Sequence, residues 1–210
     1  MRDPSIEIAR VVGRDVSRET MERLNIHLAL LKQWNPTINL VAPSTIAEGW
    51  ARHIIDSAQI IDMTDVDDGG WLDIGSGGGF PGLVCAILAF DYKPALRFTL
   101  VESDKRKAAF LATVVRNTDI PVNIESKRIE TLPPQAAQVI SARALAPLDL
   151  LLKYAEPHLV SNGICIFPKG SRYSEEVDRA RQGWRFKLDT KPSITDPKAA
   201  ILLLGDIERA

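Results

Sequence analysis

A glycine-rich stretch between an apolar run and a proline constrains the fold of this chain more than any other feature. Residues 71–82 read WLDIGSGGGFPG. Trp71–Ile74 predicts a buried strand, and Pro81 suits the first turn of a helix, where its missing N–H group would have no partner. Glycines let the backbone approach a ligand closely, and a helix N-terminus offers unpaired N–H groups. The stretch therefore predicts a nucleotide-type cofactor site between a strand and a helix.

Two cofactor templates fit this stretch. Three glycines ending at Gly82 match the dinucleotide pattern G-x-G-x-x-G, and Glu102 lies twenty residues further on, where a ribose-binding acid is expected. Asp73 and the three alternate glycines after it match D-x-G-x-G-x-G, which is similar to the first motif of class I S-adenosylmethionine-dependent methyltransferases. Glu102 suits the ribose of either cofactor, or a cap of the helix expected after it. At this level NAD and S-adenosylmethionine both remain open.

Beyond residue 70 the sequence alternates between apolar runs typical of strands and amphipathic segments typical of helices. Such alternation is typical of an α/β fold with a mostly parallel, doubly wound sheet. We expect strands at Trp71–Ile74, Leu96–Glu102, Val122–Ser126, Val139–Ser141 and Gly163–Phe167, helices at Pro81–Phe90, Ser103–Asn117 and Pro147–Glu156, and a final strand pair at Trp184–Asp189 and Ala199–Leu204.

The region before residue 71 is predicted to be helical. One amphipathic helix is expected to end at Asn35–Pro36, because the residue before a proline is pushed out of the helical conformation. A second helix is expected to begin near Thr45, where Thr45 and Glu48 fit a capping box. Glu48, Arg52 and Asp56 follow at four-residue spacing, which predicts a ladder of weak ion pairs on one helix face.

Size and composition narrow the class of protein. The 210 residues suit one domain with a small appendage, and we expect a helical extension at residues 1–66 packed on a Rossmann-like domain at residues 67–210. The net charge of −1 argues against a generic nucleic-acid coat protein, which would be basic overall. Neither a signal peptide nor a membrane span is recognisable, so we expect a soluble, cytoplasmic protein. Cys85 and Cys165 lie in apolar runs, which predicts buried free thiols, and no metal site is predicted.

Seven short motifs occur in one order along the chain. They are Trp34–Leu40, Arg52–Ser57, Asp73–Gly82, Val101–Lys107, Arg128–Glu130, Ser141–Ala144 and Pro168–Gly170. This ordered set closely resembles the RsmG (GidB) family of bacterial small-subunit ribosomal RNA methyltransferases. The resemblance implies a class I methyltransferase fold with S-adenosyl-L-methionine as methyl donor. It also implies methylation of N7 of a guanine in the 530 loop of 16S ribosomal RNA, within the small ribosomal subunit.

The resemblance also implies a set of cofactor-binding residues. They are Gly75, Gly77, Phe80, Glu102, Ile129, Glu130 and Arg143. In this assignment Glu102 binds the ribose, Ile129 and Glu130 surround the adenine, and Arg143 lies near the methionine end. The residue types suit these roles, because isoleucine offers an apolar face to a base and arginine can hold a carboxylate through two hydrogen bonds. Arg143 also suits an ion pair with a carboxylate of the core.

Binding of 16S ribosomal RNA requires side chains that contact phosphates and an unpaired base. The candidates are Arg52, His53, Lys105, Arg106, Arg128, Lys169 and Arg172. Guanine N7 carries a lone pair and no proton, so in-line methyl transfer to it needs no general base, and no catalytic base is assigned. Three alternatives stay open: an NAD-dependent oxidoreductase, a non-catalytic ribosome assembly factor, and a methyltransferase that acts on a small molecule or a protein. Nothing in the sequence calls for an oligomer, and we expect a monomer.

Overall fold

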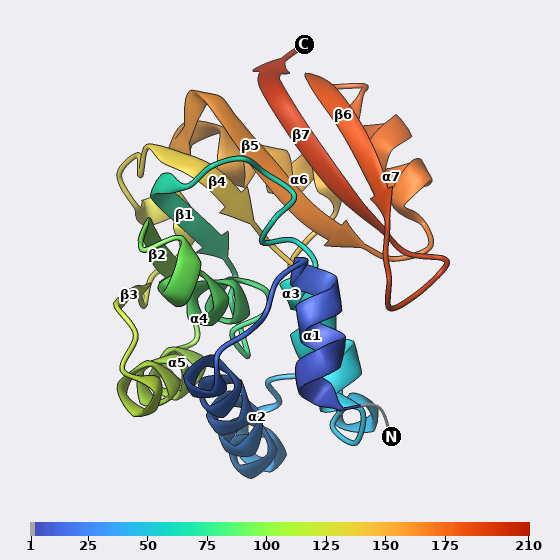
Figure 1. Ribbon diagram of the computed structural model, residues 1–210. Coiled ribbons are helices and arrows are strands. Elements are labelled where there is room, and N and C mark those ends of the chain that lie inside the picture. The colour runs from blue at the N-terminus through green and yellow to red at the C-terminus, as the bar shows by residue number, and fades with distance from the viewer. Residues whose placement is uncertain (1–2) are drawn as a thin grey trace.

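The computed structural model describes residues 3–210, which form a seven-stranded sheet flanked by helices. The strands are β1 (Asp68–Ile74), β2 (Ala95–Val101), β3 (Val122–Glu125), β4 (Ala137–Ser141), β5 (Leu159–Lys169), β6 (Trp184–Pro192) and β7 (Ala200–Arg209). Their order is β3-β2-β1-β4-β5-β7-β6. The first five strands in this order are parallel, whereas β7 runs antiparallel to both β5 and β6 (Figure 1). The predicted α/β fold and the final strand pair are confirmed.

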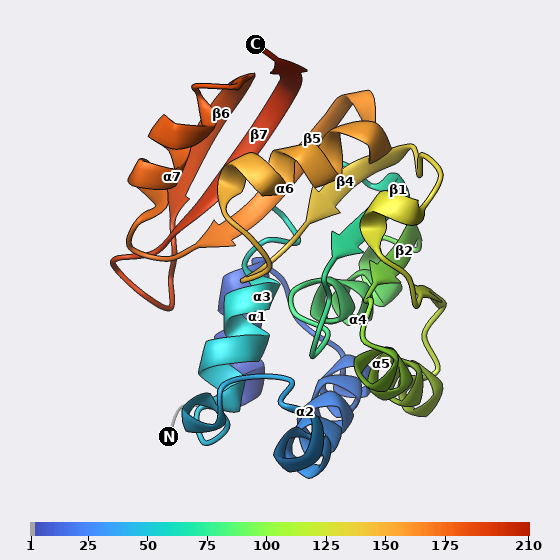
Figure 2. The same ribbon diagram turned by 180° about the vertical axis from the view of Figure 1, so that it is seen from behind.

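Helices cover both faces of the sheet, as Figures 1 and 2 show from opposite sides. They are α1 (Pro4–Val12), α2 (Arg18–Ile38), α3 (Asp56–Ala58), α4 (Gly82–Tyr92), α5 (Lys105–Thr118), α6 (Leu148–Ala155) and α7 (Tyr173–Ala180), with a π-helix at Trp50–Ile55 and 3-10 turns at Pro43–Thr45, Ile129–Thr131 and Glu156–His158. Trp71 packs in one apolar core with α1–α5, and Leu72 packs in another with α6 and α7. Adjacent side chains of β1 enter different cores because successive residues of a strand point to opposite faces.

Helix α2 ends later than its sequence predicts. The prediction that it ends at Asn35–Pro36 is wrong, because the helix continues to Ile38. Pro36 lies in the last turn, where its missing N–H removes only one intrahelical hydrogen bond. The helix is terminated by Asn39, which adopts a left-handed φ of 48° and donates its N–H to Asn35 O at 3.0 Å. A proline near a helix end therefore marks this boundary only to within a turn.

The second N-terminal helix begins later than expected. A capping box would need the Thr45 hydroxyl to accept the N–H of Glu48. Instead this hydroxyl donates to Ala42 O at 2.7 Å and lies 2.8 Å from His53 Nε2. The predicted capping box is therefore wrong, and the helical segment starts only at Trp50. The Thr45 hydroxyl bonds instead to His53, which lies outside the four-residue window that defines a capping box. The local sequence pattern therefore does not reveal this partner.

The N-terminal helices pack on the same face of the sheet as α4 and α5. Leu24 and Leu31 of α2 belong to the apolar core that also contains Phe110 of α5. The division of the chain at residue 66 stays a prediction. Cys85 and Cys165 are buried and free, as expected. Within residues 3–210 no helix combines the length and apolar character that crossing a membrane requires.

Candidate active site

A cavity of about 830 Å³ lies at the edge of the sheet where β1, β2, β4 and β5 end. This volume is within the range of roughly 300–1,000 Å³ that is typical of small-molecule sites. The lining comes from the segments that follow these strands, and also from residues 40–56 and from the loop between β6 and β7. Ligands of open α/β sheets bind at this edge. The position and size of the cavity therefore fit the predicted cofactor site.

The glycine loop between β1 and α4 lines part of the cavity. Gly75, Gly77 and Gly79 adopt φ values of 68°, 52° and 87°, a left-handed conformation that other residues rarely tolerate. The N–H of Gly75 donates to Val101 O at 2.9 Å, which ties the loop to the end of β2. A Cβ atom on Gly75 would lie 2.6 Å from a methyl carbon of Leu145. The loop can follow this path, close to its neighbours, only because glycines occupy these positions.

Glu102 follows β2 beside the glycine loop, and only 7% of it is exposed. Its Oε2 accepts the N–H of Gly77 at 2.9 Å, and its Oε1 accepts the N–H of Asp104 at 2.8 Å. Asp104 is the N-cap of α5, so Glu102 orders both the loop and the turn into that helix. A carboxylate offers about four acceptor sites, which leaves two for the hydroxyl groups of a ligand. The structural and the ligand-binding interpretations of Glu102 are therefore compatible.

Asp73, the acidic residue of the first motif, lies beneath the glycine loop and does not line the cavity. Ser141 Oγ donates to its Oδ1 at 2.6 Å, and its backbone carbonyl accepts the hydroxyl of Ser76 at 3.0 Å. Complete burial raises the pKa of Asp73 to about 6, because a low-dielectric environment disfavours the charged carboxylate. Asp73 thus holds the loop from below.

Phe80, at the end of the glycine loop, is stacked between two histidine rings. The centroid of His27 lies 4.8 Å from that of Phe80 with the planes 13° apart, and His53 lies at 4.9 Å and 26°. His27 Nε2 also lies 2.7 Å from Gly78 O, so α2 supports the loop through both a hydrogen bond and a ring contact. Sequence reasoning assigned no role to His27. The available signal was its place between Leu24 and Leu31 on the apolar stripe of α2.

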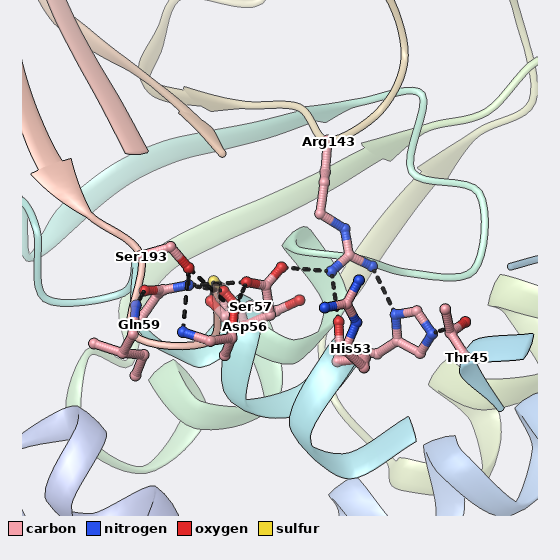
Figure 3. A network of polar contacts seen from close by, with 11 residues as sticks. Thr45, His53, Asp56, Ser57, Gln59, Arg143 and Ser193 are labelled. Carbon is pink, nitrogen blue, oxygen red and sulfur yellow. Dashed lines mark hydrogen bonds and ion pairs between the residues drawn. The ribbon is translucent and has the colours of Figure 1, made fainter. Parts of the chain in front are cut away.

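Arg143 reaches from the segment after β4 into a polar network drawn in Figure 3. Its Nη1 donates to Asp56 Oδ2 at 2.9 Å, and its Nη2 lies 3.2 Å from His53 Nδ1. The side chains of Arg143 and Asp56 are only 16% and 19% exposed. The predicted ladder along Glu48, Arg52 and Asp56 is wrong, since no residue from 3 to 210 other than Arg143 forms an ion pair with Asp56. A nearly buried guanidinium is a stronger partner for this carboxylate than an exposed neighbour on its own helix.

The same network fastens the loop between β6 and β7 to α3. Thr195 Oγ1 donates to Asp56 Oδ1, and Gln59 Nε2 donates to the same oxygen at 3.1 Å. Gln59 Oε1 accepts the N–H of Ile194 at 3.0 Å, and Gln59 Nε2 lies 3.4 Å from Ser193 Oγ (Figure 3). Sequence reasoning missed this part of the site. More than a hundred residues separate the partners, and no local pattern joins them.

The structure brings some of the predicted site residues together and separates others. Gly75, Gly77, Phe80, Glu102, Arg143, Arg52, His53 and Lys169 line the cavity, whereas Ile129, Glu130, Lys105, Arg106, Arg128 and Arg172 do not. Ile129 is buried in the core next to α6, and the other five outside the cavity are exposed. Lys169 Nζ donates to Glu176 Oε2 at 2.7 Å and to Ala146 O at 2.8 Å, with 8% of its side chain exposed. Its charge therefore holds the segment after β4 in place.

The hydrogen bonds of His27 and His53 fix their protonation. Gly78 O can only accept, so His27 carries a proton on Nε2. The Arg143 guanidinium can only donate, so Nδ1 of His53 is unprotonated and the proton of this ring is on Nε2. Burial lowers the pKa of each ring to about 4.

We expect nitrogen NMR at neutral pH to show the rings of both His27 and His53 as neutral Nε2–H tautomers. Because the unfolded chain binds these protons first, the free energy of unfolding should fall as the pH drops from about 6.5 toward 4. A titration midpoint near 6.5 for either ring would contradict this assignment.

Known proteins similar to this chain support an enzymatic interpretation of the cavity. The model of the family described as rRNA small subunit methyltransferase G (GidB) matches residues 20–200. A protein named ribosomal RNA small subunit methyltransferase G from Ruegeria sp. (strain TM1040) is 52% identical over 195 residues, which cover 93% of this chain and 95% of the relative. A protein of the same name from Paramagnetospirillum magneticum is 45% identical over 194 residues, which cover 92% of each chain.

Solved structures resemble this chain at much lower sequence identity. A ribosomal protein L11 methylase from Lactobacillus delbrueckii subsp. bulgaricus aligns with a TM-score of 0.58 at 14% identity, over 75% of this chain and 78% of the other. M. jannaschii TYW2, in complex with AdoMet, aligns with a TM-score of 0.53 at 11% identity, over 81% of this chain and 78% of the other. These likenesses concern the fold, which is the Rossmann-like class I fold of methyltransferases.

Proposed function

Because this chain belongs to the rRNA small subunit methyltransferase G family, whose members methylate ribosomal RNA with S-adenosyl-L-methionine, we propose that it methylates N7 of a guanine in the 530 loop of 16S ribosomal RNA. The observation that supports this most is the cavity, in which the glycine loop and Glu102 meet cationic side chains at one edge of the sheet. The family assignment also favours a methyltransferase over the NAD-dependent oxidoreductase that the glycine pattern left open.

The residues around the cavity fit S-adenosyl-L-methionine. When bound, this cofactor supplies an electrophilic methyl group on a sulfonium sulfur. Glu102 keeps two acceptor sites for a ribose diol, and the backbone of Gly75 and Gly77 lies open along the cavity. We assign the methionine end to the part of the cavity lined by Phe80 and Arg143. Ile129 and Glu130 stay the proposed adenine neighbours, on sequence grounds alone.

The proposed mechanism needs no proton transfer from the enzyme, because guanine N7 carries a lone pair and no proton. The histidines next to the cavity agree with this, since both ring nitrogens of His53 are hydrogen-bonded and His27 is fully buried. Asp73 is enclosed beneath the loop and reaches no substrate. The residues of this chain would therefore act by holding the two reactants in line and by excluding water.

Cationic side chains in and around the cavity suit an RNA substrate. Arg52 and Lys107 line the cavity, and neither side chain forms an ion pair with any residue from 3 to 210. We assign phosphate contacts to these two and to the exposed residues Lys105, Arg106, Arg128 and Arg172. His53 and Lys169, by contrast, would influence RNA binding through the shape of the site. We propose that the protein is a monomer and that its substrate is the small ribosomal subunit. Because this particle is cytoplasmic, we propose a cytoplasmic location for the protein too.

The test is methyl transfer from labelled S-adenosyl-L-methionine to small ribosomal subunits from cells that lack this protein. Labelled RNA is then cleaved at N7-methylguanine and mapped. We expect label at one guanine of the 530 loop. Label at another atom or another base would overturn the proposed specificity while leaving a methyltransferase. Cofactor binding with no label on intact subunits would favour the non-catalytic assembly factor.

A further inference from the structure

The loop between β6 and β7 places an apolar side chain at the edge of the cavity. Ser193, Thr195 and Asp196 line the cavity, and Ile194 between them does not. The side chain of Ile194 instead faces solvent, and 59% of the residue is exposed. A single exposed isoleucine is ordinary on a protein surface and by itself implies nothing. What sets Ile194 apart is its position on a loop that lines the cavity.

The backbone around Ile194 is held firmly. Its N–H donates to Gln59 Oε1 at 3.0 Å, and the residues on either side bond to Gln59 and Asp56. Asp56 is in turn paired with Arg143 at 2.9 Å, so the loop is anchored on the polar network of the site. Ile194 is therefore presented to solvent in a fixed place.

A second exposed apolar side chain and two cations line the same cavity. Leu145, which lines the cavity from the segment after β4, is 40% exposed and lies against Gly75. Arg52 and Lys107 line the same cavity. Apolar side chains and cations around one cavity suit a ligand that combines flat bases with phosphates. They are less suited to a protein partner, which would need a larger continuous apolar area.

We propose that Ile194 packs against the face of an unpaired nucleobase of the RNA substrate, next to the base that enters the cavity. This inference rests on the proposed function. A base that reaches the reactive methyl must leave its stack, and its neighbours then expose their faces. Apolar side chains commonly occupy such gaps in nucleic acids. The loop between β6 and β7 is on this basis an RNA-contacting element that the sequence analysis did not include.

The test compares Ile194→Ala with Ile6→Ala. Ile6 is a matched control because it is 61% exposed, lies on α1 and does not line the cavity. We measure binding to small ribosomal subunits that lack the modification, over a series of salt concentrations, together with the Kd for S-adenosyl-L-methionine. Ile194→Ala should weaken subunit binding about five- to tenfold and raise KM accordingly, since an apolar contact is lost. The salt slope and the cofactor Kd should not change, because no charge is removed.

A second variant separates a base contact from a merely structural effect. Ile194→Phe offers a larger flat surface to a base, so this variant should bind ribosomal subunits at least as tightly as the wild type. Equal subunit affinity for Ile194→Ala and Ile6→Ala would overturn the inference, as would a parallel loss of cofactor affinity, which would indicate a collapsed loop. If the wild-type protein binds subunits but labels no guanine, the proposed function fails, and the Ile194 binding comparison still decides whether the loop contacts RNA.

Discussion

Gly82→Ala is expected to lower the free energy of unfolding by about 3 kcal/mol, the upper end of what overpacking usually costs. A Cβ atom at this position would lie 2.5 Å from Cγ of Asp73. Asp73 cannot easily give way, because it is fully buried on β1 and bonded to Ser141. The higher helix propensity of alanine offsets little of this cost, because residue 82 is the first residue of α4 and not an interior one.

Gly183→Ala is the matched control, because a Cβ there would meet nothing within 4 Å. Urea unfolding at neutral pH measures both variants against the wild type. The midpoint of Gly82→Ala should fall well below the other two, and cofactor binding should weaken as the glycine loop loses its support. Similar midpoints for the two variants would show that β1 and α4 can move apart at this contact.

Asp56→Ala should cost about 3 kcal/mol, because it leaves a nearly buried guanidinium without its counter-ion. Thr195 and Gln59 lose their shared acceptor at the same time. The loop that carries Ile194 should loosen, so binding to ribosomal subunits should weaken along with stability. Asp56→Asn preserves an acceptor oxygen and should lose less than the alanine variant.

Lys187→Ala provides the comparison for this ion pair. Lys187 Nζ lies 2.7 Å from Asp206 Oδ2, closer than the 2.9 Å of the Arg143 pair, but the two side chains are 84% and 55% exposed. Water and salt screen exposed pairs and leave them little net contribution to stability, so this variant should unfold almost like the wild type. Equal losses for Asp56→Ala and Lys187→Ala would refute the argument that burial, and not distance, sets the cost.

The sequence predicted those parts of the site whose signals are contiguous. The glycine loop and Glu102 were found because a strand, a turn and a helix follow each other within a few residues, and strand ends meet at one edge of a parallel sheet. Thr195 and Gln59 were not found, because their bonds join segments that no periodicity relates. The prediction for Thr45 was wrong for a similar reason, since its hydroxyl bonds to His53 and not to the N–H of Glu48.

The rings of His27 and His53 lie against Phe80 at the end of the glycine loop, and both come from the first 66 residues. Residues 1–66, which the sequence suggests are a small appendage, therefore provide the side chains that pack against the glycine loop. A shortened protein that starts near residue 67 would keep every glycine of the loop between β1 and α4 as well as Glu102, and would still lose His27 and His53, the two aromatic neighbours of Phe80. We therefore expect the smallest fragment that still transfers methyl groups to include the N-terminal helices.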